Sequence, residues 1–136
     1  MNLVSIRLIT DDAPKLVSFY ERVTGLVATW YTPDFAEVVT PSGTLAIGST
    51  STVSLFAPGS ARPAANRTAI IELLVDDVDA HHRRLSDPGL AIEFVNEPTT
   101  MPWGNRSLLL RDPDGTLVNL FTPVTDDART KFATAL

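Results

Sequence analysis

Two side chains with the clearest capacity for chemistry in this 136-residue sequence, Arg7 and Glu72, stand 65 positions apart. Arginine presents a planar fork of N–H donors that matches carboxylate and phosphate groups. A glutamate that is shielded from water can act as a base. The two side chains therefore predict one of two things: an ion pair that fixes the structure, or a site that orients a polar ligand.

Other catalytic residue types are scarce. The two histidines, His81 and His82, are adjacent in a predicted helix, where neighbours point about 100° apart and cannot bind one metal together. We expect one to pack against the sheet and the other to be exposed. The chain has no cysteine, which excludes disulfides, thiolate metal sites and cysteine nucleophiles. No histidine is placed to activate a serine.

The composition is that of a globular protein, with 44% hydrophobic and 20% charged residues. Eleven basic and sixteen acidic side chains give a net charge of −5, so a nucleic-acid partner is not expected. The sequence lacks a signal-peptide pattern and an apolar run of about 20 residues, so we expect a cytoplasmic location and no membrane partner.

The sequence repeats itself with an offset of 65 residues. With this offset, Leu8–Asp12 aligns with Leu73–Asp77, and Val53–Pro58 aligns with Val118–Pro123. We therefore expect a single domain, residues 1–136, in four consecutive parts: a first repeat at about 3–58, a linker at 59–67, a second repeat at about 68–123, and a tail at 124–136. For the tail, the sequence leaves three alternatives open: a short helix, a disordered segment, or a segment that packs on a partner.

Each repeat begins with an aliphatic strand that ends at a pair of aspartates, a signal for the start of a helix. The hydrophobic patterns predict strands at 3–10, 26–32, 35–40 and 44–56 in the first repeat, and at 69–75, 90–96, 105–111 and 116–122 in the second. The expected fold is α+β, with two tandem βαβββ modules that form one curved mixed sheet around a pseudo-symmetric cleft.

Three segments carry a family resemblance: Ser18–Gly25, Val75–Ala80, and Trp103–Arg106 followed by Arg111–Thr116. In this order and spacing they resemble the vicinal oxygen chelate superfamily. That superfamily includes glyoxalase I, extradiol dioxygenases, and the fosfomycin and bleomycin resistance proteins. The resemblance extends over residues 3–123 and implies a fold rather than one reaction.

The resemblance implies four metal-ligand positions in the cleft, which fall on Ser5, Ser54, Ile70 and Asn119. None of these is a histidine or a carboxylate, and such side chains are poor ligands for a divalent cation. A shift of two residues in the first strands substitutes Arg7 and Glu72, which still supply only one carboxylate. We therefore predict a cleft without a metal and no cofactor.

The predicted ligand-binding residues share strand positions that face this cleft or lie in a loop beside it. They are Ser5, Arg7, Ser54, Phe56, Ile70, Glu72, Trp103, Asn119 and Phe121. Trp103 is expected to roof the cleft, with ordinary core packing as the alternative. The aromatic lining favours an aromatic or amphipathic ligand.

The leading hypothesis is a non-catalytic protein that sequesters or senses a small molecule, as the bleomycin resistance branch does. The alternative is a metal-independent isomerase or lyase in which Glu72 or Glu37 removes a proton and Arg7 stabilises the anion. A third interpretation is a metal-dependent lyase or dioxygenase whose ligands are misassigned. The resemblance also implies a homodimer.

Overall fold

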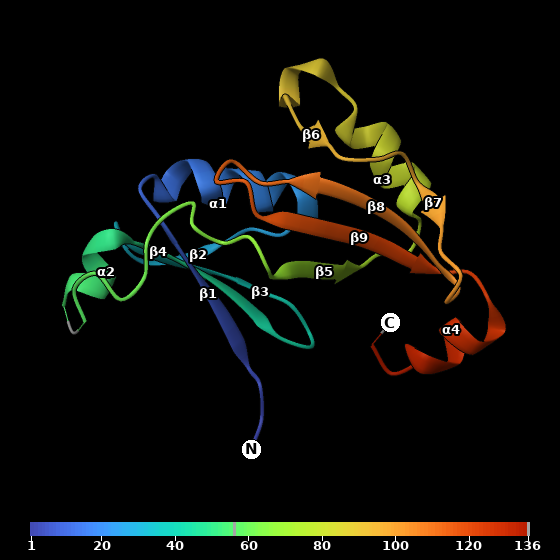
Figure 1. The fold of residues 1–136 in the computed structure, drawn as a ribbon, viewed down its shortest axis with the longest axis horizontal. Coiled ribbons are helices and arrows are strands. Elements are labelled where there is room, and N and C mark those ends of the chain that lie inside the picture. Colours follow the sequence, from blue (N-terminus) through green and yellow to red (C-terminus); the bar gives the residue numbers. More distant parts are fainter. Residues whose placement is uncertain (56, 136) are drawn as a thin grey trace. The chain divides into compact units, whose positions relative to one another are not determined.

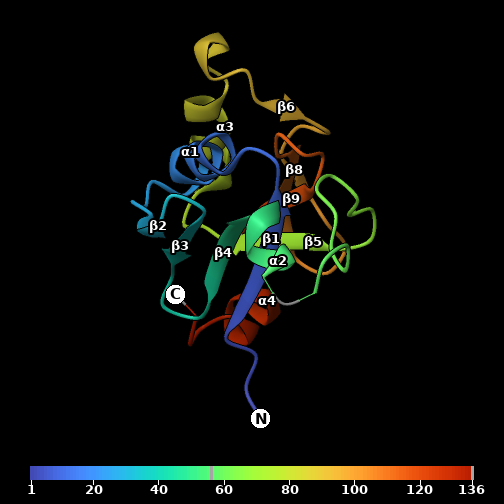
Figure 2. The same ribbon diagram turned by 90° about the vertical axis from the view of Figure 1, so that its left-hand side faces the viewer.

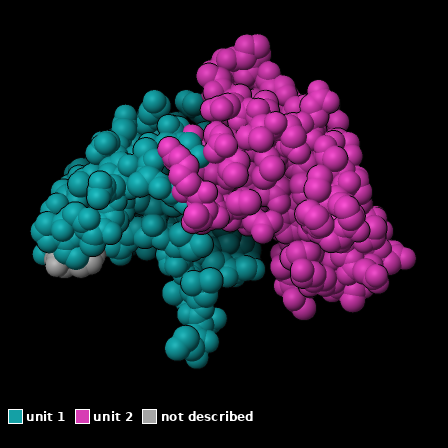
Figure 3. Space-filling model, viewed as in Figure 1, with its two compact units in different colours: residues 1–66, 113–115 teal, residues 67–112, 116–136 magenta. Residues whose placement is uncertain are grey.

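The computed structural model describes residues 1–55 and 57–135. The chain divides into two compact units, coloured separately in Figure 3: residues 1–66 with 113–115, and residues 67–112 with 116–136. Each unit contains its own mixed sheet.

The first unit contains four strands and two helices (Figure 1). They are β1 (Ser5–Thr10), α1 (Ala13–Thr24), β2 (Thr29–Thr32), β3 (Phe35–Val39), β4 (Thr44–Ser49) and α2 (Thr50–Ser54). The strand order is β1-β4-β3-β2, with β1 parallel to β4 and the other pairs antiparallel.

Helix α1 packs on β3 and β4 (Figure 2). It begins where the Asp12 carboxylate accepts a hydrogen bond from the Lys15 amide, and it ends at Gly25, whose φ of 73° is in the left-handed region. The helix buries Leu16, Tyr20 and Val23 completely or nearly so. This apolar face of α1 must be covered by another surface. The side of the first sheet that covers it therefore becomes part of the core.

The second unit repeats the order with additions. Its elements are β5 (Ile70–Leu74), α3 (Val78–Leu85), a 3₁₀ turn η1 (Pro88–Leu90), β6 (Glu93–Phe94), β7 (Thr99–Thr100), β8 (Asn105–Arg111), β9 (Leu117–Pro123) and α4 (Asp126–Lys131). The sheet order is β5-β9-β8-β6, with β7 also paired to β8. Strand β5 is parallel to β9, as β1 is to β4.

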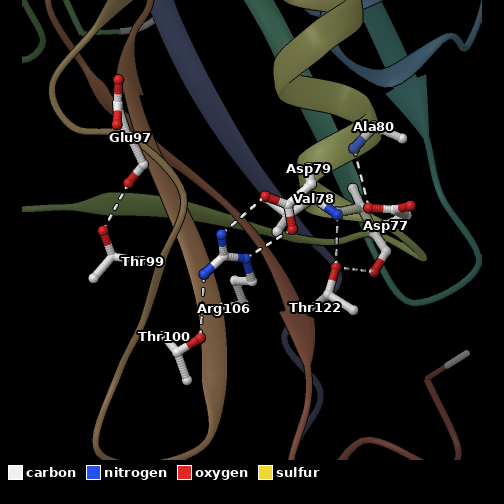
Figure 4. Close-up of polar contacts among 10 residues, drawn as sticks. Asp77, Val78, Asp79, Ala80, Glu97, Thr99, Thr100, Arg106 and Thr122 are labelled. Atoms are coloured by element: carbon white, nitrogen blue, oxygen red, sulfur yellow. Dashed lines mark hydrogen bonds and ion pairs between the residues drawn. The ribbon is translucent and has the colours of Figure 1, made fainter.

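Side-chain hydrogen bonds attach α3 to its sheet (Figure 4). The Arg106 guanidinium donates to both carboxylate oxygens of Asp79, at 2.7 and 3.0 Å. The Thr122 hydroxyl accepts from the Val78 amide at 2.9 Å and donates to the Val75 carbonyl at 3.0 Å. These contacts place α3 against β8 and β9.

The α+β class and the two βαβββ modules are confirmed. Strand 105–111 has the predicted bounds, and a helix forms in the tail. The predicted strand at 44–56 is wrong beyond Ser49, because Thr50–Ser54 forms α2. Threonine, serine and valine in this segment imitate a strand composition, although the chain turns back on itself here.

Gly48 permits that turn. A Cβ at this position would lie 2.7 Å from the Thr52 hydroxyl oxygen, and that hydroxyl donates to the Ser49 carbonyl. A side chain at residue 48 would therefore press on the Thr52 hydroxyl of α2. Among the described residues, no helix is both long enough and apolar enough to cross a membrane.

Candidate functional site

The first sheet has one face that α1 does not cover, which we call the Arg7 face. Along β1, β3 and β4 the side chains on this face are those of Ser5, Arg7, Ile9, Phe35, Glu37, Val39, Thr44, Ala46 and Gly48. Successive strand residues alternate between faces, so Leu45, Ile47, Ala36 and Val38 form the buried side. Two predicted ligand-binding residues, Ser5 and Arg7, thus share one surface.

The exposed Arg7 side chain lies over an aromatic ring on this face. Its Cζ atom is 5.2 Å from the centre of the Phe35 ring, and the Phe35 ring is 6.0 Å from that of Tyr31. The Tyr31 hydroxyl donates to the Glu37 carboxylate at 3.4 Å. Within the described residues of the first unit, the Arg7 guanidinium has no hydrogen-bond or salt-bridge partner.

The central strand of this face carries small residues. Thr44, Ala46 and Gly48 lie between β1 and β3, and Arg7 and Glu37 both pair with Ala46 from opposite sides. A cavity of about 440 Å³ lies on the β1 side of the face, and its volume is within the range of small-molecule sites. It is lined by Ser5, Arg7, Ile9, Val53, Ser60 and Ala61.

The corresponding surface of the second sheet, the Glu72 face, is built differently. It contains Ile70, Glu72, Leu74, Ser107, Leu109, Asn119 and Phe121. Asn119 pairs with Glu72 in the strand register, and its Nδ2 donates to Glu72 Oε2 at 2.9 Å. The Asn119 Oδ1 atom is buried without a hydrogen-bond partner in the described part of the chain.

The tail covers part of the Glu72 face. The Phe132 ring lies 5.1 Å from the Phe121 ring, and Phe121 is buried. Gly104 anchors this arrangement, since its carbonyl accepts from the amides of Val124 and Thr125. Its φ is +91°, and a Cβ there would overlap the Thr125 side chain. The tail thus covers the Phe121 end of the Glu72 face, whereas Ile70 and Glu72 on β5 remain exposed.

The strand register corrects one prediction. Ser5 pairs with Thr44 as Ile70 pairs with Leu117, so the counterpart of Asn119 is Ala46 and not Ser54. The 65-residue offset holds for the first strands and helices and fails for the last strands. Ser54 lies in α2 and is exposed.

The remaining predicted site residues have varied positions. Ile70 is about half exposed, and Trp103 is 67% exposed in the loop before β8, so Trp103 is not a core residue. Phe56 is outside the described residues. Arg7 and Glu72 belong to different units, and their ion pair remains a prediction.

Sequence reasoning missed five residues of the Arg7 site: Ile9, Phe35, Val53, Ser60 and Ala61. Strand alternation gives Phe35 the same face as Glu37, a signal present in the sequence. Val53 was assigned to a strand, and the two linker residues carry no signal.

Both histidines pack on their own unit, so the expected exposed histidine is not observed. The His82 ring contacts the Phe94 ring edge-on at 5.0 Å. His81 lies between Asp76, at 3.6 Å, and Arg84, at 3.0 Å. Both side chains are half-buried, since these partners hold His81 down on the helix surface.

The donor sets of the two faces do not fit a divalent metal. The aligned row Arg7, Ala46 and Glu37 offers one carboxylate, and the row Glu72, Asn119 and Leu109 offers one carboxylate and one amide. Nowhere in the described residues do three histidine, cysteine or acidic side chains gather as a metal site would need. Neither set of side chains could therefore hold a catalytic divalent cation.

A further cavity, of about 360 Å³, lies in the second unit beside α4. It is lined by Val75, Asp76, Thr122, Pro123, Val124 and Arg129. It contains none of the predicted site residues and lies at the ends of β5 and β9 rather than on a sheet face.

Comparison with known proteins gives one family. A family model, that of the Glyoxalase/Bleomycin resistance protein/Dioxygenase superfamily, matches residues 2–120. The uncharacterized protein YraH of Bacillus subtilis (strain 168) is 27% identical over 127 residues, which cover 89% of this chain and 98% of YraH.

Solved structures show the same fold. A glyoxalase/bleomycin resistance protein/dioxygenase from Nocardioides has a TM-score of 0.73 at 23% identity, covering 93% of this chain and 85% of its own. A family enzyme from Burkholderia phytofirmans PsJN has a TM-score of 0.77 at 16% identity, covering 91% and 100%.

Proposed function

This chain belongs to the Glyoxalase/Bleomycin resistance protein/Dioxygenase superfamily, and from that premise we propose that it binds a small aromatic or amphipathic molecule on the Arg7 face and sequesters or senses it. The observation that carries the proposal is the 440 Å³ cavity against Arg7. Apolar walls from Ile9, Val53 and Ala61 suit the body of such a ligand, and a few polar groups suit its orientation.

The neighbouring aromatic pair supports this choice of ligand. Tyr31 and Phe35 lie beside Arg7, and they present ring surface on the same face of the sheet. Aromatic side chains bury large areas on binding with little loss of conformational freedom.

Binding without catalysis is supported by the state of the candidate bases. Glu72 is exposed to water, and its carboxylate accepts a hydrogen bond from Asn119. Glu37 is half-buried, and the Tyr31 hydroxyl donates to it in the same way. Neither carboxylate lines the cavity beside Arg7.

The test is a thermal-shift screen of aromatic metabolites, glycopeptide drugs and divalent metals on three proteins. A ligand present at about 100 times its dissociation constant adds about 2.7 kcal/mol to the unfolding free energy. Ser60→Trp fills the cavity from its exposed wall, whereas Ser42→Trp places the same side chain on the exposed turn before β4.

We expect hits that stabilise the parent and Ser42→Trp and do not stabilise Ser60→Trp. A hit that stabilises all three proteins equally would place its site elsewhere. A screen in which a metal alone stabilises the chain would replace the proposal with a metal-dependent function.

A further inference from the structure

We propose that the ligand of the Arg7 face is an organic oxyanion, a carboxylate in its simplest form, held by the N–H groups of Arg7. This inference rests on the proposed function, since it names the chemical class of the molecule that the face binds. It comes from the geometry of one side chain and its surroundings.

The contact with Phe35 leaves the hydrogen-bonding capacity of Arg7 unused. With Cζ 5.2 Å from the ring centre, the cation lies over the ring, and a ring face offers no oxygen acceptor to the N–H groups. Within the described residues of the first unit, no carboxylate, carbonyl or hydroxyl accepts from them. The guanidinium therefore lines the cavity with its donors unpaired in this unit.

The rest of the cavity suits an anion that has an apolar body. The hydroxyls of Ser5 and Ser60 line the same cavity as Arg7 and add hydrogen-bond donors. Ile9, Val53 and Ala61 form the remaining walls and carry no charge. A guanidinium and a carboxylate form the paired, charge-assisted hydrogen bonds for which arginine is specialised.

A nearby acid gives the inference a second, independent check. Glu37 and Arg7 flank Ala46 on the same face, two strand spacings apart, or roughly 10 Å. At that distance a carboxylate still repels a bound anion at low ionic strength. The whole chain carries a net charge of −5, so anion binding must depend on Arg7 itself and not on the overall charge.

The experiment compares three probes of one size: benzoate, benzamide and benzylammonium. Each is titrated into ¹⁵N-labelled protein at low salt, and the amide shifts of residues 5–9 and 44–48 give the dissociation constant. We expect benzoate to bind about five- to tenfold more tightly than benzamide, the range expected for a charged hydrogen-bonded pair. Benzylammonium should bind most weakly.

Variants locate the effect. Arg7→Gln should remove the preference for benzoate, and Arg7→Lys should retain part of it, because lysine keeps the charge but not the fork. Arg83→Gln removes one positive charge from exposed α3 and should change nothing. Glu37→Gln should strengthen benzoate binding about two- to threefold, since it removes a repelling charge.

Equal binding of benzoate and benzamide, unchanged benzoate binding in Arg7→Gln, or no benzoate binding would each overturn the inference. The proposed function would survive these results if neutral aromatic hits still fail to stabilise Ser60→Trp. The proposed function itself would be contradicted if no aromatic molecule, whether anionic, neutral or cationic, binds the Arg7 face.

Discussion

The Arg7 face and the Glu72 face are corresponding surfaces of the two βαβββ modules, yet a cavity lies beside Arg7, whereas the tail covers Phe121 on the Glu72 face. In both units a short helix follows the last strand: α2 after β4 and α4 after β9. At the matching register position the first unit has Gly48 and the second has Phe121.

These two residues differ in what covers them. Thr52 of α2 lies against Gly48, and the neighbouring Val53 lines the cavity beside Arg7. Phe132, which follows α4, instead packs on Phe121, so the tail covers that part of the Glu72 face. The two copies of the module thus share a strand register and differ in the segment that returns over the sheet.

The largest expected effect concerns the two leucines that the 65-residue offset aligns, Leu55 and Leu120. Leu120 is fully buried, so Leu120→Ala should cost about 2–5 kcal/mol of unfolding free energy. Leu55 is 86% exposed at the end of α2, so Leu55→Ala should change it by less than about 0.5 kcal/mol. Urea denaturation measures both. Similar losses in the two variants would restore the sequence alignment and refute the register.

The next prediction compares the loss of stability on substituting two glycines, Gly48 and Gly104, which lie against α2 and against the start of α4. Gly104→Ala should cost about 2–3 kcal/mol, because its φ is +91° and the new methyl overlaps Thr125. Gly48→Ala should cost less, about 1–2 kcal/mol, since only the Thr52 hydroxyl must move. Thermal unfolding of each variant gives the order.

The double variant Gly48→Ala/Thr52→Ala tests the cause. It should lose clearly less stability than the two single changes together, because the alanine at 52 makes room for the new methyl. Strict additivity would mean that α2 does not lie against Gly48.

The smallest effect concerns the ion pair between Asp79 of α3 and Arg106 of β8. The hydrogen bond from Arg106 lowers the pKa of the Asp79 carboxyl below its ordinary value. The pair therefore contributes stability above the unfolded-state pKa, and this contribution is lost as the pH falls through the lower folded-state pKa. The residue of α1 that corresponds to Asp79 is Pro14, which carries no charge and cannot form an ion pair.

Asp79→Asn should lower the melting temperature by about one to three degrees at pH 7, the scale of a partly exposed pair. The difference from the parent should shrink below pH 4. Thermal scans from pH 2.5 to 7 measure it, with Asp126→Asn, in a weaker surface pair at 3.5 Å, as the control. A difference that stays constant down to pH 2.5 would show that Asp79 acts through packing and not through charge.

The sequence was sufficient for the repeat, the α+β class, the aspartate caps and the strand at 105–111, since each is written in local patterns. The sequence could not place Ser54, because the Thr-Ser-Thr-Val segment has residues typical of a strand. That the segment forms a helix became clear only from the structure, in which Thr52 lies against Gly48. Ser60 and Ala61 enter the cavity through the path of a linker, which no periodicity encodes. Arg7 was identified from its chemistry, but its contact with Phe35 required the strand pairing.

The central claim is that ligands bind the Arg7 face and not the Glu72 face. The most direct measurement is to assign the backbone amides by NMR and to map the shifts caused by a saturating hit from the screen. The account predicts changes concentrated in residues 5–9, 44–48 and 60–61, with residues 70–74 and 117–123 unchanged. Changes concentrated in the second set, around Glu72 and Asn119, would contradict it.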